Sequence, residues 1–532
     1  MANNTFESAE EGMLQELSRE KKKLEEKRDK LAQELEHVEL NIIKTQAAYG
    51  AIYNKRSPLL NLPTEVTCLI FEYALLPSVE EEKDEEKGEE EPPEYLMEVT
   101  VSHVCRRWRA IALDFPSLWS VFCYEGAEAQ RVPLDRFNAY MERSGTHLLE
   151  LRLNFKGAGE DDDHEPLLQK AFLHVARWRR VTILSDQDTL LWTQLSKAEN
   201  VAAPNLEYLA ICPDVECECG NQGDLTEVED LEPKLFGGGA PKLTSVWTDG
   251  TGPSACLPPL SNVTTLRIEE NEASMAHKFS WTTFLDLLSL PALEDLSLVG
   301  ETFLVPDFAF VEPVHMKSLK NLRFSDEGGM VNLLPLIRAP LLETLHIMNC
   351  WIEYSFSTYK LNSTYSFPSL RDLYFVESSA DDEPARCFLN LTSSVKNVVL
   401  SGEDFEDCLL NTIITHVLET DTNVWPHLKN LTCNMQPPNE IEPYLAFAQS
   451  RPKKSRLVLR LDEDLVESWE EDDQLAEQLK TLKRVCKVKN LNRDEPLEGE
   501  GWPPGRETYS AIAIEDDDPF IIESYYASGD DE

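Results

Sequence analysis

One apolar pattern recurs along the middle of this chain, and it limits the folds that the chain can adopt. The pattern has the form Leu-x-x-Leu-x-Leu, with other apolar residues replacing leucine at some positions. The starts of successive units lie about 28 residues apart on average, from Leu148 to Leu428. A unit this short cannot bury its apolar residues alone, so the recurrence predicts a row of stacked units.

Eleven units can be aligned on this pattern. The clearest begin at Leu206, Val263, Leu293, Leu319, Leu342, Leu370, Val395 and Leu428, and weaker ones begin at Leu148, Trp178 and Leu243. In six units a proline stands two positions before the first apolar residue, where it ends the preceding segment before a strand starts (Pro204, Pro241, Pro291, Pro340, Pro368, Pro426). The units resemble leucine-rich repeats, which implies a solenoid over residues 145–461. Its turns are expected to be irregular, because the Asn or Cys that usually follows the last apolar residue remains only as Asn271 and Cys350 in a few units.

Strand periodicity divides the side chains of each unit between two faces. The apolar residues of the pattern point into the core, and the alternating residues point to the concave face. Aromatic and arginine side chains dominate binding energy at many protein interfaces. The candidates for binding a protein substrate are therefore Tyr208, Trp247, Arg267, Arg323, His346, Tyr374 and Asn430. For any single one of them, an ordinary half-exposed strand position is the commoner explanation.

Residues 57–124 predict short amphipathic helices. Pro63 suits the start of a helix, since its missing amide hydrogen would have no partner there, and Val66 and Ile70 follow with helical spacing. A second helix carries Val101, Val104, Cys105, Trp108 and Ile111 on one face. So few residues cannot bury all of their large apolar side chains, and part of this surface is expected to contact another protein.

The same residues resemble the F-box. The Leu-Pro pair at 62–63 and the Val-Cys-Arg-Arg-Trp-Arg run at 104–109 carry the resemblance. It implies docking on the Skp adaptor of cullin-RING ubiquitin ligases through Leu62, Pro63, Val66, Ile70, Val104, Cys105 and Trp108. The acidic run 79–94 separates the helices by more than the family pattern does. We interpret it as a tolerated insertion, with a contact site for a basic partner as the alternative.

The first segment, 1–56, predicts a coiled-coil helix. Leu17, Leu24, Leu31 and Val38 recur every seven residues, and Leu14, Leu35 and Ile42 lie on the interleaved positions, which Lys21 and Arg28 interrupt. The pattern leaves three possibilities open: a homodimer, packing against the rest of the chain, and a solvated charged helix.

The C-terminal part predicts two segments. An amphipathic stretch at 462–490 is expected to form a helix that caps the open end of the repeats. The acidic tail 491–532 is expected to be disordered. A hypothesis is that the apolar cluster around Phe520 and Tyr525 folds back on the concave face.

Charge and motif content restrict the function. The 96 Asp and Glu residues outnumber the 50 Lys and Arg residues, which disfavours nucleic acid and anionic membranes as partners. No secretion signal or membrane span is apparent, and the twelve scattered cysteines suit a reduced cytoplasmic or nuclear location. No nucleotide-binding or hydrolase motif occurs, and Cys212, Cys217 and Cys219 lack the spacing of a zinc site. We therefore expect no cofactor and no metal.

The sequence thus favours an α/β chain with an N-terminal coiled-coil helix, a short all-α F-box and an irregular leucine-rich-repeat solenoid. The expected function is that of a substrate adaptor without an active site of its own, which brings a protein substrate to a ligase built on a Skp adaptor and a cullin. The alternative is a protein-interaction scaffold that uses the coiled coil and the repeats without ubiquitin machinery.

Overall fold

The protein is described by a computed structural model. The described residues are 3–54, 56, 58–75, 96–126, 133–156, 165–185, 194–212, 226–250, 252–269, 277–304, 313–325, 328–352, 365–402, 424–435, 441–451, 457–491 and 502–503. They fall into two compact units, of which the first comprises Met1–Leu75 with Glu86–Phe115 and the second Leu76–Glu85 with Pro116–Glu532. The acidic run 79–94, the cluster at 520–526, and Cys217 and Cys219 lie outside the described residues.

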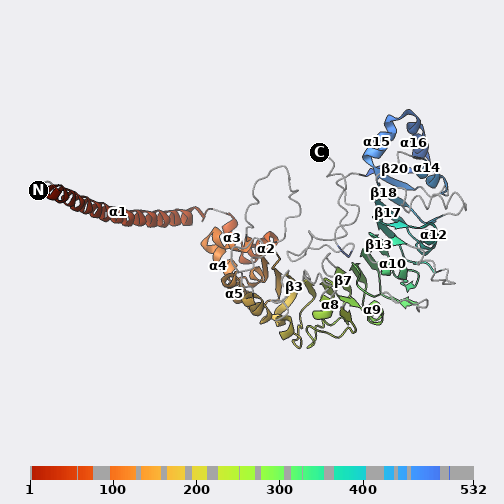
Figure 1. Cartoon of the computed structure of the whole chain (residues 1–532), viewed down its shortest axis with the longest axis horizontal. Helices are drawn as coiled ribbons and strands as arrows, with labels where there is room; N and C mark the ends of the chain where they lie inside the picture. The colour runs from red at the N-terminus through yellow and green to blue at the C-terminus, as the bar shows by residue number, and fades with distance from the viewer. Residues whose placement is uncertain are drawn as a thin grey trace. The chain divides into compact units, whose positions relative to one another are not determined.

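The first unit is entirely helical in its described part. It consists of the long helix α1 (Asn3–Asn54), a 3-10 turn (Pro58–Asn61), and the short helices α2 (Thr64–Ala74), α3 (Met97–Val104) and α4 (Arg106–Leu113) (Figure 1). Phe71 of α2, Val101 of α3 and Ile111 of α4 are buried, so each short helix contributes an apolar residue to a small common core.

The prediction of one continuous helix across Val101–Ile111 is wrong. The chain breaks at Cys105, whose backbone is extended (φ −158°, ψ 168°). The Cys105 Sγ atom accepts a hydrogen bond from the backbone nitrogen of Trp108 at 3.4 Å, so the residue caps α4. A helix N-terminus has free amide donors, and this side chain supplies an acceptor for one of them.

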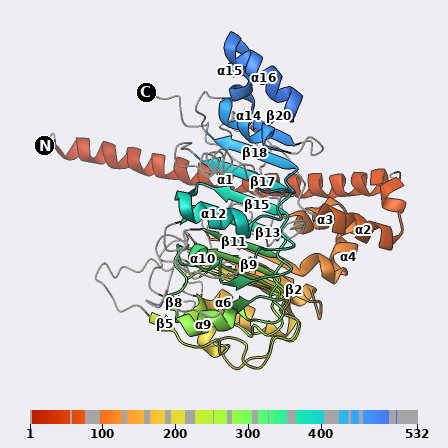
Figure 2. The ribbon, with the colours of Figure 1, turned by 90° about the vertical axis from the view of Figure 1, so that its right-hand side faces the viewer.

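The second unit is built on one parallel sheet of 14 strands. In spatial order the strands are β1 (Val121–Glu125), β2 (Leu149–Asn154), β3 (Trp178–Leu184), β4 (Tyr208–Cys212), β6 (Ser245–Thr248), β7 (Thr265–Glu269), β9 (Asp295–Val299), β11 (Asn321–Ser325), β13 (Thr344–Met348), β15 (Asp372–Val376), β17 (Asn397–Gly402), β18 (Asn430–Met435), β19 (Val458–Asp462) and β20 (Lys487–Leu491). Each strand pairs with the next one along the chain in this list, so the sheet grows in one direction from β1 to β20 (Figure 2).

Helices and short strand pairs fill the connections between these strands. The helices are α5 (Leu134–Arg143), α6 (Glu165–Phe172), α8 (Gly252–Ala255), α9 (Trp281–Leu288), α10 (Gly328–Leu333), α12 (Asp382–Leu391), α14 (Glu442–Gln449), α15 (Glu463–Glu471) and α16 (Asp473–Val485). The short pairs are β5 (Thr226–Val228) with β8 (His277–Phe279), β10 (Val314–His315) with β12 (Ile337–Arg338), and β14 (Trp351–Ile352) with β16 (Ser379–Ala380). Within this unit the sheet is curved, and α9, α12 and α14 lie on its outer side (Figure 1).

The core of the second unit is a ladder of apolar residues in register. Leu266, Leu296, Leu322 and Leu345 pair from strand to strand, and each is fully buried. Burying one such side chain stabilises a fold by about 1.5–3 kcal/mol, and the ladder repeats that gain at each of these four strands. The Leu-x-x-Leu-x-Leu pattern therefore places its apolar residues on the side of the sheet that the helices cover.

Each of the eleven predicted units coincides with one strand of the sheet, from β2 to β18. The sheet continues beyond both predicted bounds, with β1 before residue 145 and β20 after residue 461, and it contains one strand near the C-terminal bound, β19, that the eleven units do not include. The pattern missed β19 because Arg456 stands where the first apolar residue of the unit would be. Residues 462–490 hold α15, α16 and most of β20 rather than a single helix.

Candidate functional site

The first candidate surface, which we call the F-box face, is the open side of α2. Val66, Leu69 and Ile70 are 38%, 52% and 37% exposed, whereas Thr67 and Phe71 on the other side of the same helix are buried. The spacing of the exposed residues places them on one side of the helix. An apolar face that the protein leaves exposed to water indicates a contact surface for another protein.

Two contacts hold this face in position. The ring of Trp108 lies edge-on to that of Phe71, with centroids 5.1 Å apart and planes inclined by 71°. The Arg107 guanidinium donates a hydrogen bond to the backbone oxygen of Leu62, at the start of α2. Since α4 supplies both Arg107 and Trp108, it fixes the orientation of α2.

The predicted Skp-contact residues divide by exposure. Pro63, Val66, Ile70 and Val104 are exposed, and Leu62, Cys105 and Trp108 are half-buried. Trp108 and Cys105 also have internal roles, as the partner of Phe71 and as the cap of α4. The predicted set omits Leu69 and Tyr73, which are 52% and 74% exposed and which follow the same helical spacing.

The second candidate surface lies on the face of the sheet opposite the apolar ladder. Its central row runs through Trp247, Arg267, Ser297, Arg323, His346 and Tyr374, which pair in register on β6, β7, β9, β11, β13 and β15. Tyr208 and Asn430 lie in the neighbouring row of the same face, two residues earlier in their strands. The structure therefore brings five of the seven predicted substrate contacts into one row.

A buried charge cluster lies in the middle of this row. The Arg267 guanidinium donates two hydrogen bonds to Glu269, at 2.9 Å and 2.6 Å, and Arg323 donates one to the Glu269 Oε1 atom at 2.8 Å. The hydroxyl of Ser297 donates to the same carboxylate and accepts from Arg323. We call these four residues the Glu269 cluster.

The two arginines determine the charge state of Glu269. Burial alone would raise the pKa of this carboxyl, but the charges of Arg267 and Arg323, together with hydrogen bonds from Arg267 and Ser297, outweigh it and hold the pKa at about 2. Glu269 is therefore ionised at neutral pH. Burying a guanidinium costs less free energy when an opposite charge pairs with it. Glu269 supplies that opposite charge for both arginines.

Aromatic rings cover both arginines. The Arg267 guanidinium lies over Trp247 at 4.3 Å from the ring centroid, and that of Arg323 lies over Trp502 at 4.6 Å. Trp502 comes from the C-terminal part of the chain and is only 8% exposed. The protein's own Trp502 thus contacts the surface predicted for substrate.

Exposure of the seven predicted substrate contacts is low. Trp247, Arg323 and His346 are buried, and Tyr208, Arg267, Tyr374 and Asn430 are half-buried. His346 and Tyr374 lie side by side with ring centroids 5.4 Å apart, and Asn430 donates to the Asn397 side chain at 2.6 Å. Sequence reasoning missed Glu269, although its position two residues after Arg267 places it on the same face.

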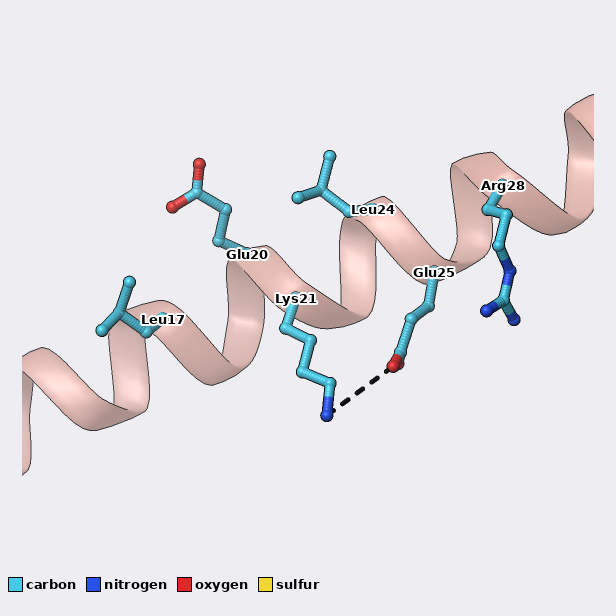
Figure 3. Close-up of a pocket in the computed structure, with 6 residues that line it drawn as sticks. All are labelled: Leu17, Glu20, Lys21, Leu24, Glu25 and Arg28. Carbon is cyan, nitrogen blue, oxygen red and sulfur yellow. Dashed lines mark ion pairs between the residues drawn. The ribbon is translucent and has the colours of Figure 1, made fainter.

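A shallow hollow on α1 is not an enclosed site. Leu17, Glu20, Lys21, Leu24, Glu25 and Arg28 line it (Figure 3). All six residues come from neighbouring turns of one helix, and Lys21 reaches Glu25 at 3.9 Å along that helix. A hollow with walls from a single helix cannot enclose a small molecule.

The described residues give no sign of a metal centre. They contain no group of three or more His, Cys, Asp or Glu side chains that could hold a metal ion. Cys212 is buried in β4, and no disulfide joins the cysteines in this part of the chain. Among the helices that the structure describes, none is long and apolar enough to cross a membrane.

Comparison with known families gives a match that includes the residues of the F-box face. The family described as F-box-like matches residues 59–125, which include α2, α3, α4 and β1. No curated protein shows a significant match to the chain. The chain therefore carries an F-box-like domain at residues 59–125, and this domain holds the F-box face.

Proposed function

We propose that the protein is a substrate-recognition adaptor of a Skp-cullin-F-box ubiquitin ligase. The observation that carries the proposal is the F-box face, an exposed apolar strip that lies inside the F-box-like domain. In this role the face docks on the Skp adaptor. Leu62, Pro63, Val66, Ile70, Val104, Cys105 and Trp108 form or support that contact.

The second unit supplies the substrate surface in this proposal. Eleven strands of its parallel sheet, from β2 to β18, carry the Leu-x-x-Leu-x-Leu pattern, which supports a solenoid of irregular leucine-rich repeats. Substrate binds along the central row, where the half-buried Arg267 and Tyr374 offer a guanidinium and a ring. Trp502 occupies part of the same row, so a substrate binds beside it or displaces it.

The chemistry of ubiquitin transfer lies outside this chain in the proposed complex. The adaptor contributes proximity: a substrate held near the conjugating enzyme presents its lysines at a high effective concentration. The protein acts in the cytoplasm or nucleus in this role, where the ligase machinery is found.

Binding of the purified chain to the Skp adaptor tests the proposal. The wild type should bind tightly, and the double variant Leu62→Ala/Pro63→Ala should lose binding. A cullin added to the bound pair should join it. A folded wild-type chain that does not bind the Skp adaptor would contradict the proposal and would favour the scaffold alternative.

A further inference from the structure

The seam of α1 is a long apolar strip that the described residues leave exposed. Leu14, Leu17, Leu24, Leu31, Leu35, Val38 and Ile42 are all between 50% and 67% exposed. They follow the alternating three-and-four spacing of a coiled coil, and Lys21 and Arg28 occupy two positions of the same seam. A helix of 52 residues with such a seam needs a partner helix of similar length to cover it.

We propose that two copies of the chain associate through α1 as an antiparallel two-stranded coiled coil. In the register that we propose, Leu24 packs against Leu35 of the second copy, and Leu17 packs against Ile42. The two basic seam residues then meet apolar residues, Lys21 against Val38 and Arg28 against Leu31. The centre of this arrangement falls between Asp29 and Lys30, close to the middle of the helix, so the two helices overlap along almost their whole length.

Charges beside the seam favour this register. Lys27 of one copy faces Glu34 of the other, and the symmetry of the dimer makes this pair twice. The other flanking positions between Ser18 and Asn41 pair a charged residue with an uncharged one, as in Glu20 with Asn41 and Glu25 with Ala32. Opposite charges at flanking positions of a coiled coil determine the orientation and choice of partner.

A parallel homodimer places like charges together. In register, Lys21 would meet Lys21 and Arg28 would meet Arg28 within the seam. The flanking pairs would be Glu20 with Glu25 and Glu34 with Glu39, each made twice. No flanking pair in the described part of the helix would join opposite charges, and like-charged neighbours destabilise such helices.

Antiparallel registers shifted by one heptad are also unfavourable. A shift toward the N-terminus brings Lys27 against Lys27 and Glu20 against Glu34. A shift toward the C-terminus brings Glu34 against Glu34 and Glu25 against Glu39. Shifts of two heptads avoid these contacts but leave apolar seam residues at one end without a partner. The proposed register alone combines full overlap with attractive flanking charges.

Cysteine cross-linking of the full-length chain tests the orientation. Leu24→Cys and Leu35→Cys each add one thiol to the seam, and α1 has no cysteine of its own. With a short bifunctional maleimide, a mixture of the two variants should give a cross-linked dimer, and neither variant alone should exceed the wild-type background. A Leu24→Cys chain that cross-links to itself would overturn the antiparallel orientation, since only a parallel dimer brings that position against its own copy.

A charge reversal tests the register independently. Glu34→Lys should weaken the dimer roughly tenfold, because two attractive pairs with Lys27 become repulsive. The matched swap Lys27→Glu/Glu34→Lys restores both pairs and should restore the dissociation constant. In a parallel dimer Glu34→Lys would relieve repulsion with Glu39 and tighten binding, which would overturn the proposal.

Analytical ultracentrifugation provides the readout for these variants and a further test of self-association. The wild-type chain should sediment as a dimer at micromolar concentration. A wild-type chain that remains a monomer at tens of micromolar would overturn the proposal and would leave α1 to a different partner. A trimer would overturn it as well. None of these measurements depends on Skp binding, so failure of one proposal can be distinguished from failure of the other.

Discussion

The F-box face and the central row of the sheet differ in what their side chains contact. The F-box face leaves apolar side chains exposed, whereas the side chains of the central row contact one another. On the F-box face, Val66 and Ile70 are exposed and have no polar groups to satisfy. In the central row, Arg267 and Arg323 are bound to Glu269 and covered by rings from Trp247 and Trp502. The comparison shows that residue type alone does not make a binding surface. A free surface also requires that the protein itself leaves those residues without internal partners.

The largest effect is expected at the Glu269 cluster. Glu269→Gln removes the charge that offsets Arg267 and Arg323, and breaking a buried ion pair in this way costs about 3–5 kcal/mol. The urea midpoint should fall accordingly. Glu294→Gln is the matched control, because Glu294 pairs with Lys320 at the surface and its loss should shift the midpoint little. Equal shifts of the urea midpoint for the two variants would show that the Glu269 cluster stabilises the fold no more than a surface ion pair does.

The next effect concerns the F-box face. Val66→Asp/Ile70→Asp should weaken Skp binding by at least about 100-fold, since each carboxylate would be buried against an apolar partner surface. Both positions are exposed, so thermal unfolding should remain close to that of the wild type. Leu173→Asp is the control, because Leu173 is 81% exposed and lies outside the F-box-like domain. Unchanged Skp binding by the double variant would refute docking through this face.

The acid stability of the sheet unit should depend on Glu269. Its pKa in the folded protein, about 2, lies below the ordinary value of 4.5. A lowered pKa means that the ionised carboxylate stabilises the fold fully above about pH 4.5 and loses that contribution as the pH falls toward 2. The difference in unfolding free energy between the wild type and Glu269→Gln should therefore shrink over that interval. A difference that stays constant from pH 5 to pH 2.5 would contradict the assignment.

The smallest effect is expected at Trp502. Trp502→Ala removes the ring that covers Arg323, and a desolvated cation–π contact contributes about 1–2 kcal/mol. Unfolding in urea measures the loss. Trp351→Ala serves as control, because Trp351 is 60% exposed and should tolerate the change. If Trp502→Ala is as stable as this control, the contact between Trp502 and Arg323 does not stabilise the fold.

Much of the fold can be predicted because its signals are local and periodic. The spacing of Leu266, Leu296 and Leu322 marks three strands without any knowledge of their neighbours. The pattern misses β19 because a residue of the wrong type, Arg456, stands at the position of the first apolar residue. The break at Cys105 could not be predicted from periodicity, because the apolar spacing continues across it and only the cap interrupts the helix.

The two candidate sites also differ in how much of them can be predicted from the sequence. Helical spacing predicts which residues share one face of α2, since that depends only on positions within one helix. Alternation predicts which strand residues share the central row, but it cannot predict their partners. Arg323 and Glu269 lie 54 residues apart on strands that are not adjacent, and Trp502 comes from the far end of the chain. Such pairings depend on how the strands stack in the folded protein. The sequence of a single repeat does not contain that information.

Hydrogen exchange with and without the Skp adaptor tests the central claim most directly. Slower exchange in the complex should be confined to residues 62–75 and 97–113, which form α2, α3 and α4, and the amides of the central row on β6 to β15 should exchange at unchanged rates. This result would establish the F-box face as the docking surface and leave the sheet available for substrate. Slower exchange on the central row, with none on α2, would contradict the account.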